Sequence, residues 1–483
     1  MKGCKVLIGT GMVLASLTLG LCMTLLVLGS IRYGGMHELL LRLRLELVSM
    51  RRPSPAPLVP TPLPITPSAA ATRSSPTPVR LASVPAARSA PQATATPITV
   101  PISRMSPAPL VSDAWMISLL SPQPTSEPAS VMTATPSPTI TSPTQEVFSA
   151  VSNQPHFYLS AAPSVQLSGI THVWQKWNNC GPATLAMYLS YFGITRTQAE
   201  IAAALKPNWD DKNVSPHEMA DFATQQGLLA LVRVNGDAER LRLLLSNGLP
   251  VMVETWLELE PNNGMGHYRL LTGYDDTRQI WIAYDSYVST GVKANAPYQG
   301  IQLPYAEMDA LWAVFNRTYL LLFTKELAAT VTSILAEEMD DQVMWERALA
   351  RAQAELTSRP DDPFAHFNLG SALVALGEYE QAAAAFDRAR IIGLPWRMLW
   401  YQFAPFRAYY ETGRYEELLA LANATIATAG EIEEVYYHKG LGLAALGRHD
   451  EARKHWQRAL ELNPNYKVAA VALAALNDAP PSP

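Results

Sequence analysis

The chain has 483 residues, a formal net charge of −5 and a pI near 6.0. Its length suits about three domains of ~150 residues each, and its charge lacks the basic excess that nucleic-acid binding needs, so we expect no nucleic-acid partner. Charged residues make up 16% of the sequence, against roughly 25% in an ordinary soluble domain.

An apolar stretch opens the chain. Residues 6–28 are apolar apart from small or hydroxyl residues, and two lysines precede them. About 20 such residues span a bilayer as a helix, so we interpret residues 1–35 as a membrane anchor with a transmembrane helix. A cleaved signal peptide is the alternative, although its apolar region is usually only ~7–15 residues long. Arginines after the span argue against export of the rest of the chain, but the segment that follows resembles an exported stalk. We expect an uncleaved, single-pass anchor with the folded domains outside the cytoplasm.

Residues 36–150 form a juxtamembrane segment and a linker rich in Pro, Ser and Thr. Residues 53–143 contain 21 of the 38 prolines, six charged residues and no glycine. Such a composition cannot bury enough apolar surface to offset the entropy of ordering, so it predicts disorder. Its proline content favours locally stiff polyproline II pieces of ~3.1 Å per residue. We interpret the linker as a spacer; docking of its proline motifs to a partner is the alternative.

Residues 155–328 show a mixed pattern of helices and strands. A helix is predicted to start at Cys180 and end near Gly193, and capping boxes at Thr197 and Ser215 open two short helices. A further helix is predicted over 237–246. Strands are predicted over 228–234, 250–256, 267–274, 279–285 and 319–323. Helices precede an antiparallel sheet, which predicts an α+β domain.

Cys180 is the single cysteine of this region, because Cys4 and Cys22 belong to the N-terminal stretch. Neither a disulfide framework nor a cysteine metal cluster is therefore expected there. A lone cysteine is most often a small buried apolar residue. At a helix N-terminus, however, unpaired N–H groups and a partial positive charge stabilise a thiolate. This context favours a nucleophile at Cys180.

A nucleophilic cysteine needs a base, and the region offers His156, His172, His217 and His267. The capping box around His217 favours a structural role, and His156 and His172 lie outside the predicted elements. His267 opens a predicted strand after a flexible segment. We expect it at a sheet edge with an accessible side chain.

Asp285 is the predicted partner of His267. If a three-residue loop joins the two strands, His267 and Asp285 face each other on one side of the sheet, close enough for the carboxylate to orient the imidazole. A loop one residue longer would place Ser286 opposite instead. An ordinary surface hydrogen bond is the alternative interpretation.

The stretches "QKWNNCGPATLAMYL", "GHYRLLTGYDD" and "IAYDSY" resemble the papain-like cysteine peptidases of family thirty-nine, the bacteriocin-processing or double-glycine leader peptidases. The resemblance implies Cys180 as nucleophile, His267 as general base and Asp285 as its orienting residue. It also implies that Gln175 joins the Cys180 N–H in an oxyanion hole. The family's glutamine usually stands six positions before the cysteine, whereas Gln175 stands five before Cys180.

Residues 340–478 are rich in alanine and repetitive. "ALGEYEQA", "ETGRYEEL" and "ALGRHDEA" recur with glycines at 377, 413 and 447, a spacing that resembles the tetratricopeptide repeat of ~34 residues. In the middle unit Phe406 replaces the small residue that lets the two helices pack closely. Flanking helices near 344–357 and 466–477 are expected to cap an all-α solenoid.

The leading hypothesis is a membrane-anchored cysteine peptidase that hydrolyses peptide bonds through a Cys-His-Asp triad and a thioester intermediate. Its repeats would recruit a protein partner or substrate and leave the chemistry to the peptidase domain. No cofactor or metal is expected. A non-catalytic binding scaffold, or a cell-wall amidase or transferase that uses the same thiol, are the alternatives.

Overall fold

The computed structural model describes residues 158–258, 263–289 and 297–478. The predicted anchor and the proline-rich linker lie outside these residues. Within the described ranges, no helix is both long and apolar enough to cross a membrane. All of the described residues fall within one contact-defined unit, 58–483.

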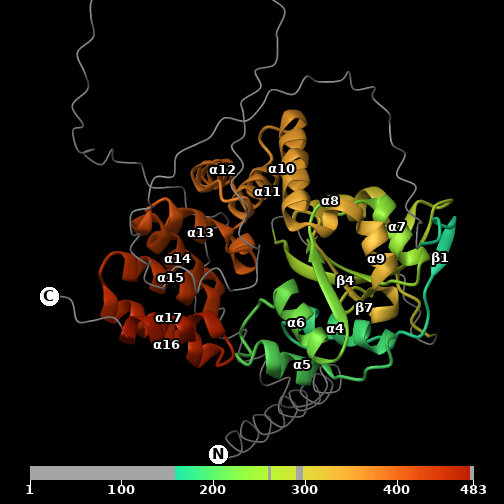
Figure 1. Ribbon diagram of the computed structural model, residues 1–483, viewed down its shortest axis with the longest axis horizontal. Helices are drawn as coiled ribbons and strands as arrows, with labels where there is room; N and C mark the ends of the chain where they lie inside the picture. Colours follow the sequence, from blue (N-terminus) through green and yellow to red (C-terminus); the bar gives the residue numbers. More distant parts are fainter. Residues whose placement is uncertain (1–157, 259–262, 290–296, 479–483) are drawn as a thin grey trace, which may run out of the picture. The chain divides into compact units, whose positions relative to one another are not determined.

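An antiparallel sheet is the centre of the N-terminal half of the described chain (Figure 1). Its strand order is β2-β7-β3-β4-β5-β6, and β1 pairs with the second half of β4. The strands are β1 (Ser164–Gln166), β2 (Leu229–Arg233), β3 (Val251–Leu257), β4 (Met265–Asp275), β5 (Ile280–Asp285), β6 (Ile301–Pro304) and β7 (Tyr319–Phe323). Strand β4 therefore lies inside the sheet, hydrogen-bonded to β3 on one side and β5 on the other.

Helices cover both faces of this sheet, because successive strand residues point to opposite sides. On one face Met252 and Leu270 share an apolar core with α4, α5 and α6, and on the other Val253 and Leu271 share one with α7, α8 and α9. The helices are α4 (Cys180–Tyr191), α5 (Gln198–Leu205), α6 (Pro216–Gln225), α7 (Ala238–Ser246), α8 (Tyr305–Ala313), the 3-10 helix η1 (Lys325–Leu327) and α9 (Ala328–Leu335). The predicted α+β organisation of this region is confirmed.

Local sequence chemistry sets where several of these helices begin. Thr197 and Ser215 each accept a hydrogen bond from the backbone N–H three residues later, and the glutamate at that position bonds back to the cap. Asp237 caps α7 by accepting the N–H of Arg240 through its side chain, without the bond back to the cap. The two predicted capping boxes are therefore present. Helix α4 also starts at Cys180, as predicted.

The pairing of β4 with β5 differs from the predicted register. Arg269, not His267, stands opposite Asp285, and the register shifts by one residue between Leu271 and Gly273. The connection runs over 276–279, so it is one residue longer and lies further along the chain than predicted, which by itself would place Leu270 opposite Asp285. The bulge adds a residue to β4 and moves the pairing back by one, to Arg269.

The C-terminal half of the described chain is helical. Three helix pairs follow one another between α10 and α17, and in the first and third pairs the facing helices pack through glycine. A Cβ atom on Gly370 would lie 2.6 Å from the ring of Phe386, and one on Gly440 would lie 2.3 Å from the indole of Trp456. The elements are η2 (Ala336–Met339), α10 (Asp341–Ser358), α11 (Pro363–Ala375), α12 (Tyr379–Ile392), η3 (Trp396–Trp400), α13 (Ala404–Glu411), α14 (Tyr415–Ala429), α15 (Glu433–Ala445), α16 (His449–Leu462) and α17 (Lys467–Asp478).

The middle pair packs with the sizes reversed. Phe386 and Trp456 each follow their glycine by sixteen positions, and the same spacing from Phe406 leads to Ala422. Both Phe406 and Ala422 are fully buried. A large residue on the first helix and a small one on the second therefore replace the usual arrangement, which explains why this unit departs from the repeat pattern.

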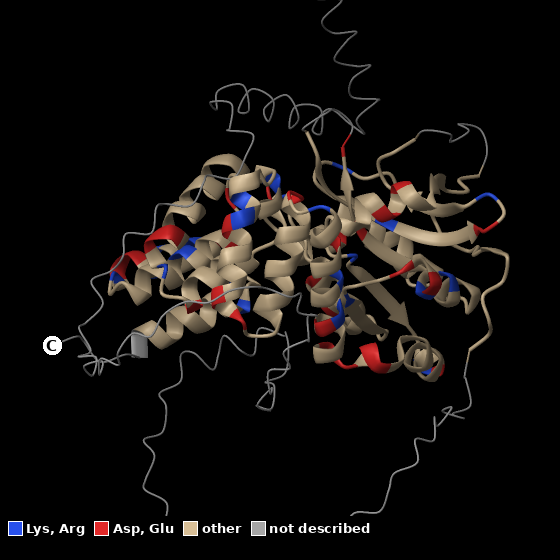
Figure 2. Ribbon diagram, turned by 90° about the horizontal axis from the view of Figure 1, so that it is seen from above, with Lys and Arg blue, Asp and Glu red and all other residues tan. Residues whose placement is uncertain are grey.

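The two halves share one apolar core and several polar contacts. Trp256 of β3 belongs to the same buried cluster as the repeat residues Phe367 and Phe386. Arg317 Nη1 donates to Glu355 Oε1 of α10 at 2.8 Å. The helices of the repeats carry both acidic and basic residues (Figure 2), some of which form ion pairs three or four residues apart.

Candidate active site

Cys180 is the first residue of α4 and is partly exposed. Asn179 occupies the N-cap position, but its side chain caps no N–H of the helix and donates to Gln198 Oε1 at 3.3 Å instead. The preceding residue, Asn178, has a positive φ of 54°. No side-chain cap thus covers the first N–H groups of α4 among the described residues, so they are available to an anion.

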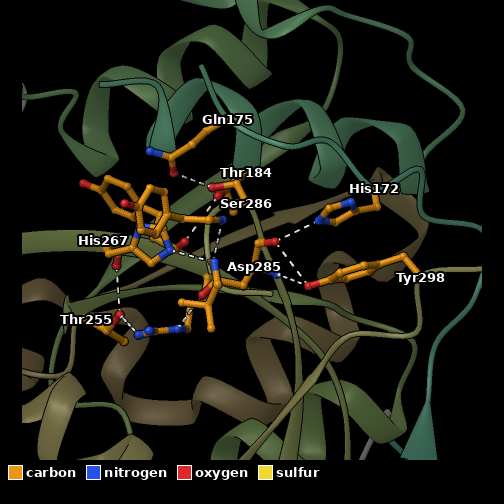
Figure 3. Close-up of polar contacts among 12 residues, drawn as sticks. His172, Gln175, Thr184, Thr255, His267, Asp285, Ser286 and Tyr298 are labelled. Carbon is orange, nitrogen blue, oxygen red and sulfur yellow. Dashed lines mark hydrogen bonds and ion pairs between the residues drawn. The ribbon is translucent and has the colours of Figure 1, made fainter. Parts of the chain in front are cut away.

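His267 connects the thiol to a buried carboxylate. Its Nε2 lies 3.0 Å from Asp285 Oδ1, which leaves Nδ1 as the ring nitrogen for the hydrogen bond with Cys180. Because Asp285 stands opposite Arg269, the contact with His267 is diagonal across the two strands, within reach of long side chains. Figure 3 shows His267 and Asp285 pointing toward each other.

Asp285 is fully buried and its carboxylate is saturated with donors. Oδ1 also accepts the N–H groups of Tyr287 and Val288, each at 2.8 Å. Oδ2 accepts Nε of Arg269 at 2.9 Å. Burial alone would raise the pKa of this carboxyl, but the charge and hydrogen bond of His267 and the charge of Arg269 hold the pKa well below its usual range.

The same contacts favour a charged thiol–imidazole pair. Burial would raise the pKa of the Cys180 thiol, but the hydrogen bond and charge of His267 and the backbone of Tyr268 outweigh it, so the pKa is lowered. Burial would lower the pKa of His267, but the charge and hydrogen bond of Asp285 raise it to about 8. A lowered thiol pKa beside a raised imidazole pKa is the electrostatic condition for a thiolate–imidazolium pair near neutral pH.

Two aromatic side chains hold the backbone of Asp285. His172 Nε2 lies 2.8 Å from the Asp285 carbonyl oxygen, and the ring of His172 stacks on Tyr298 with centroids 3.5 Å apart. The Asp285 N–H donates to the Tyr298 hydroxyl at 3.2 Å. Both contacts are visible on the right of Figure 3.

Gln175 lies across the site from His172 and is fixed by Ser286. The Ser286 hydroxyl donates to Gln175 Oε1 at 2.8 Å, and the Gln175 N–H donates to the Ser286 carbonyl at 2.8 Å (Figure 3). With Oε1 engaged, the amide Nε2 remains as the donor of this side chain. The dipeptide Asp285–Ser286 therefore orients both His267 and Gln175.

The environment of His267 corrects one expectation. His267 is only 2% exposed and lies on an interior strand, whereas an accessible position at a sheet edge was predicted. The strand begins two residues earlier than expected, and β3 extends far enough to cover it. His217 lies in the first turn of α6, and His156 lies outside the described residues.

Arg269, Ser286, His172 and Tyr298 were not predicted as site residues. Arg269 could have been found, because it follows His267 by two positions in a predicted strand and so shares its face. Ser286 directly follows Asp285. His172 and Tyr298 lie in segments without regular structure, where sequence periodicity carries no signal.

Comparisons with known proteins agree with this organisation. Residues 158–318 match the sequence model of the Peptidase_C39 like family, and residues 365–389 and 433–466 match tetratricopeptide repeat models. The chain thus carries a C39-like peptidase domain followed by tetratricopeptide repeats, as the sequence resemblance implied. No curated protein matches the chain.

Three solved structures illustrate the likeness. A protein from Bacillus anthracis described as a C39-like peptidase is 16% identical, covering 34% of this chain and 98% of its own, with a TM-score of 0.27. The peptidase domain of Streptococcus ComA is 16% identical over 33% of this chain and 100% of its own, with a TM-score of 0.25. MamA from Desulfovibrio magneticus RS-1 is 22% identical over 28% of this chain and 75% of its own, with a TM-score of 0.26.

Proposed function

We propose that the domain around the sheet is a cysteine peptidase in which Cys180 is the nucleophile, His267 the general base and Asp285 its orienting residue. The observation that carries this proposal is the continuous contact from the thiol at the start of α4, through His267, to the buried Asp285 carboxylate. The match of residues 158–318 to a peptidase family supports the same assignment.

The first half of the proposed reaction is acyl transfer to sulfur. The Cys180 thiolate attacks the carbonyl carbon of a peptide bond, and the carbonyl oxygen becomes an oxyanion. The Cys180 N–H and the amide of Gln175 are the proposed donors to this oxygen, whose charge develops only in the transition state. The His267 imidazolium then gives its proton to the amine nitrogen as the C–N bond breaks, which leaves a thioester.

The second half returns the enzyme to its starting state. His267, now neutral, removes a proton from water as the water oxygen attacks the thioester carbonyl. The C–S bond breaks, the carboxylic acid leaves, and the proton on His267 again faces a thiolate. Asp285 holds the imidazole in the orientation that both steps require.

The repeats are proposed to bind a polypeptide, because stacked helical repeats present extended surfaces for partners. A groove over α14, α15 and α16 is the candidate binding surface for this polypeptide. Its polar lining residues are Glu416, Asn423, Lys439, Arg448, Glu451 and His455. Charges of both signs suit a polar peptide segment better than an apolar helix.

Attachment to a membrane remains part of the proposal, on the strength of the apolar stretch 6–28 and the proline-rich segment that follows it. A protease added to intact cells should release a soluble fragment of about residues 150–483. A fragment that appears only after lysis would reverse the proposed orientation.

Turnover is tested with a quenched peptide library and a thiol-directed activity probe on the full chain, with Cys180→Ala as the matched control. The wild-type chain should cleave peptides and take up the probe, and Cys180→Ala should do neither while keeping its melting temperature. Probe uptake without cleavage would contradict the peptidase proposal and favour another acyl transfer at the same thiol. A folded wild-type chain that shows neither activity would indicate a binding scaffold.

A further inference from the structure

A segment of the repeat region packs against the strand that carries His267. A Cβ atom on Gly266 would lie 3.1 Å from three ring atoms of Tyr401, so this ring lies flat on the residue before His267. In the adjoining η3, Arg397 Nη1 donates to the carbonyl oxygen of Asn263 at 3.0 Å. The beginning of β4 is thus held by side chains from outside the peptidase domain.

Beside this contact lies a buried carboxyl that the proposed mechanism does not use. Glu254 of β3 stands opposite Tyr268 and is 2% exposed. Its Oε2 is buried without a hydrogen-bond partner among the described residues. Burial first, and then the charge of Cys180, raise the pKa of Glu254 to about 8, while Tyr268 and Gln402 favour its charged form. The carboxyl is therefore mostly neutral at pH 7.

Tyr401 connects these features. Burial raises the pKa of its phenol, and the charges of Cys180 and Glu254 are close enough to raise it further, while the backbone of Gly266 lowers it. The phenol therefore lies within electrostatic range of both Cys180 and Glu254. Gln402, the next residue, approaches Glu254 directly.

We propose that Tyr401, contributed by the repeat region, is a positioning residue of the peptidase site that holds the start of β4 under His267 and excludes water from Glu254 beside Cys180. The proposal rests on the proposed thiol chemistry of Cys180. It differs from the expectation that the repeats leave the chemistry to the peptidase domain.

The physical reason is like-charge repulsion. An ionised Glu254 would place a negative charge next to the thiolate and disfavour it. A rise of one unit in the pKa of the thiol would leave about ten times less thiolate at any pH below the midpoint. Keeping water away from Glu254 keeps it neutral and removes a negative charge from the neighbourhood of the thiolate.

Other charged groups lie near the pair. Lys206, after α5, affects Cys180 electrostatically, and Glu218 of α6 affects Tyr268. Asp211 in turn faces Lys206. Together with His267 on β4, these groups are unchanged in all of the variants below, so they contribute equally to each measurement.

The test is the pH dependence of Cys180 alkylation by iodoacetamide in the full chain. Mass spectrometry of the Cys180 peptide separates this thiol from Cys4 and Cys22. Tyr401→Ala should hydrate Glu254 and move the midpoint upward by about one pH unit, which makes alkylation about tenfold slower below the midpoint. Tyr401→Phe keeps the ring on Gly266 and should restore the profile. Tyr410→Ala, which removes a partly buried ring of α13 that packs on the core of the repeats, is the matched control.

The decisive comparison repeats Tyr401→Ala in a Glu254→Gln background, where no carboxylate can form and no shift is expected. An equal shift in both backgrounds, or no shift in a Tyr401→Ala protein with native circular dichroism, would overturn the proposal. If Tyr401→Ala does not fold, Gly266→Ala moves the same ring by a few tenths of an ångström and should give a smaller upward shift. No substrate is used, so a lack of peptide hydrolysis would overturn the proposed function without changing this result.

Discussion

Arg269 and His267 share one carboxylate. Arg269 Nε donates to Oδ2 of Asp285 and His267 contacts Oδ1, with all three side chains buried. The positive charge of Arg269 fixes the carboxylate in its ionised form, and it also lowers the pKa of His267. Arg269 therefore partly offsets the rise in the pKa of His267 that Asp285 causes.

Arg269→Gln should separate these two effects. Removing one partner of a buried ion pair should lower the free energy of unfolding by about 3 kcal/mol. The alkaline limb of kcat/KM, which reports loss of the His267 proton near pH 8, should move to higher pH. Chemical denaturation and a pH–rate profile measure the two quantities, with Arg242→Gln, at a side chain that is 28% exposed, as control. An alkaline limb that stays fixed would show that Arg269 does not act on His267.

The proposed role of Gln175 as an oxyanion donor requires that Ser286 hold its side-chain amide in place. Gln175→Ala should lower kcat by about 10²–10³ with little change in KM, because an oxyanion donor acts only in the transition state. Ser286→Ala should have a smaller effect of the same kind, since it only releases the Gln175 amide. A rise in KM at constant kcat would instead place Gln175 in ground-state substrate binding.

The sequence correctly predicted that His267 contacts Asp285, but the predicted register of the two strands was wrong. Both lie on neighbouring antiparallel strands, which hydrophobic alternation predicts. Their contact was expected from direct opposition, and it is diagonal because the turn is longer and lies further along the chain than predicted, a shift that the bulge in β4 only partly offsets. A period of two residues tells which side chains share a face, but the bulge that sets the register leaves no such pattern.

Among the secondary-structure elements, helix starts were the most predictable. A capping box is a local arrangement of four residues, so Thr197 and Ser215 carry the whole signal in sequence. Strand β6 was not predicted, because its four residues are too few for a periodic pattern and end in Pro304. Helix α8 follows it directly and has no side-chain cap. Such elements depend on tertiary packing against the sheet.

The helix pairs of the repeats give a prediction at the same scale. A methyl group at Gly370 would lie 2.6–2.8 Å from the ring of Phe386. Gly370→Ala should therefore lower the free energy of unfolding by about 1–3 kcal/mol through overpacking. Phe386→Leu in the same chain should recover part of this loss. Thermal and urea denaturation test it, and equal stabilities of Gly370→Ala and wild type would show that the helices can separate without cost.

No pattern in the sequence predicted the contacts that join the two halves of the described chain. Asn213 Nδ2 donates to Glu434 Oε1 at 2.7 Å across 221 residues of sequence. Asn463 Nδ2 donates at 2.7 Å to Oε1 of Glu433, the first residue of the same helix, α15. Asp211 lies close to both glutamates electrostatically. No local pattern indicates that these residues meet, because each is an ordinary polar residue in its own segment.

This junction should make stability depend on pH. Burial raises the pKa of Asp211 to about 8 and that of Glu433 to about 7, and burial also raises the pKa of Glu434. Each carboxyl holds its proton more tightly in the folded chain than in the unfolded one. The free energy of unfolding contributed by these groups is therefore fully present below pH ~4 and decreases as pH rises through about 8.

Glu434→Gln keeps the acceptor for Asn213 and removes one titrating group. Its melting temperature should fall less than that of the wild type between pH 5 and pH 8.5, with the exposed Glu461→Gln as control. Parallel curves for wild type and Glu434→Gln would show that this carboxyl does not titrate in that range.

The central claim is that His267 holds Cys180 as a thiolate, and the rate of Cys180 alkylation against pH measures this directly in wild type and His267→Ala. The wild-type rate should remain high well below pH ~8.5, the ordinary value for a cysteine thiol. In His267→Ala, with native circular dichroism, the rate should fall and its midpoint should move to the ordinary value or above. A wild-type Cys180 that reacts only above that pH, or only after unfolding, would contradict the account and leave the cysteine as a packing residue.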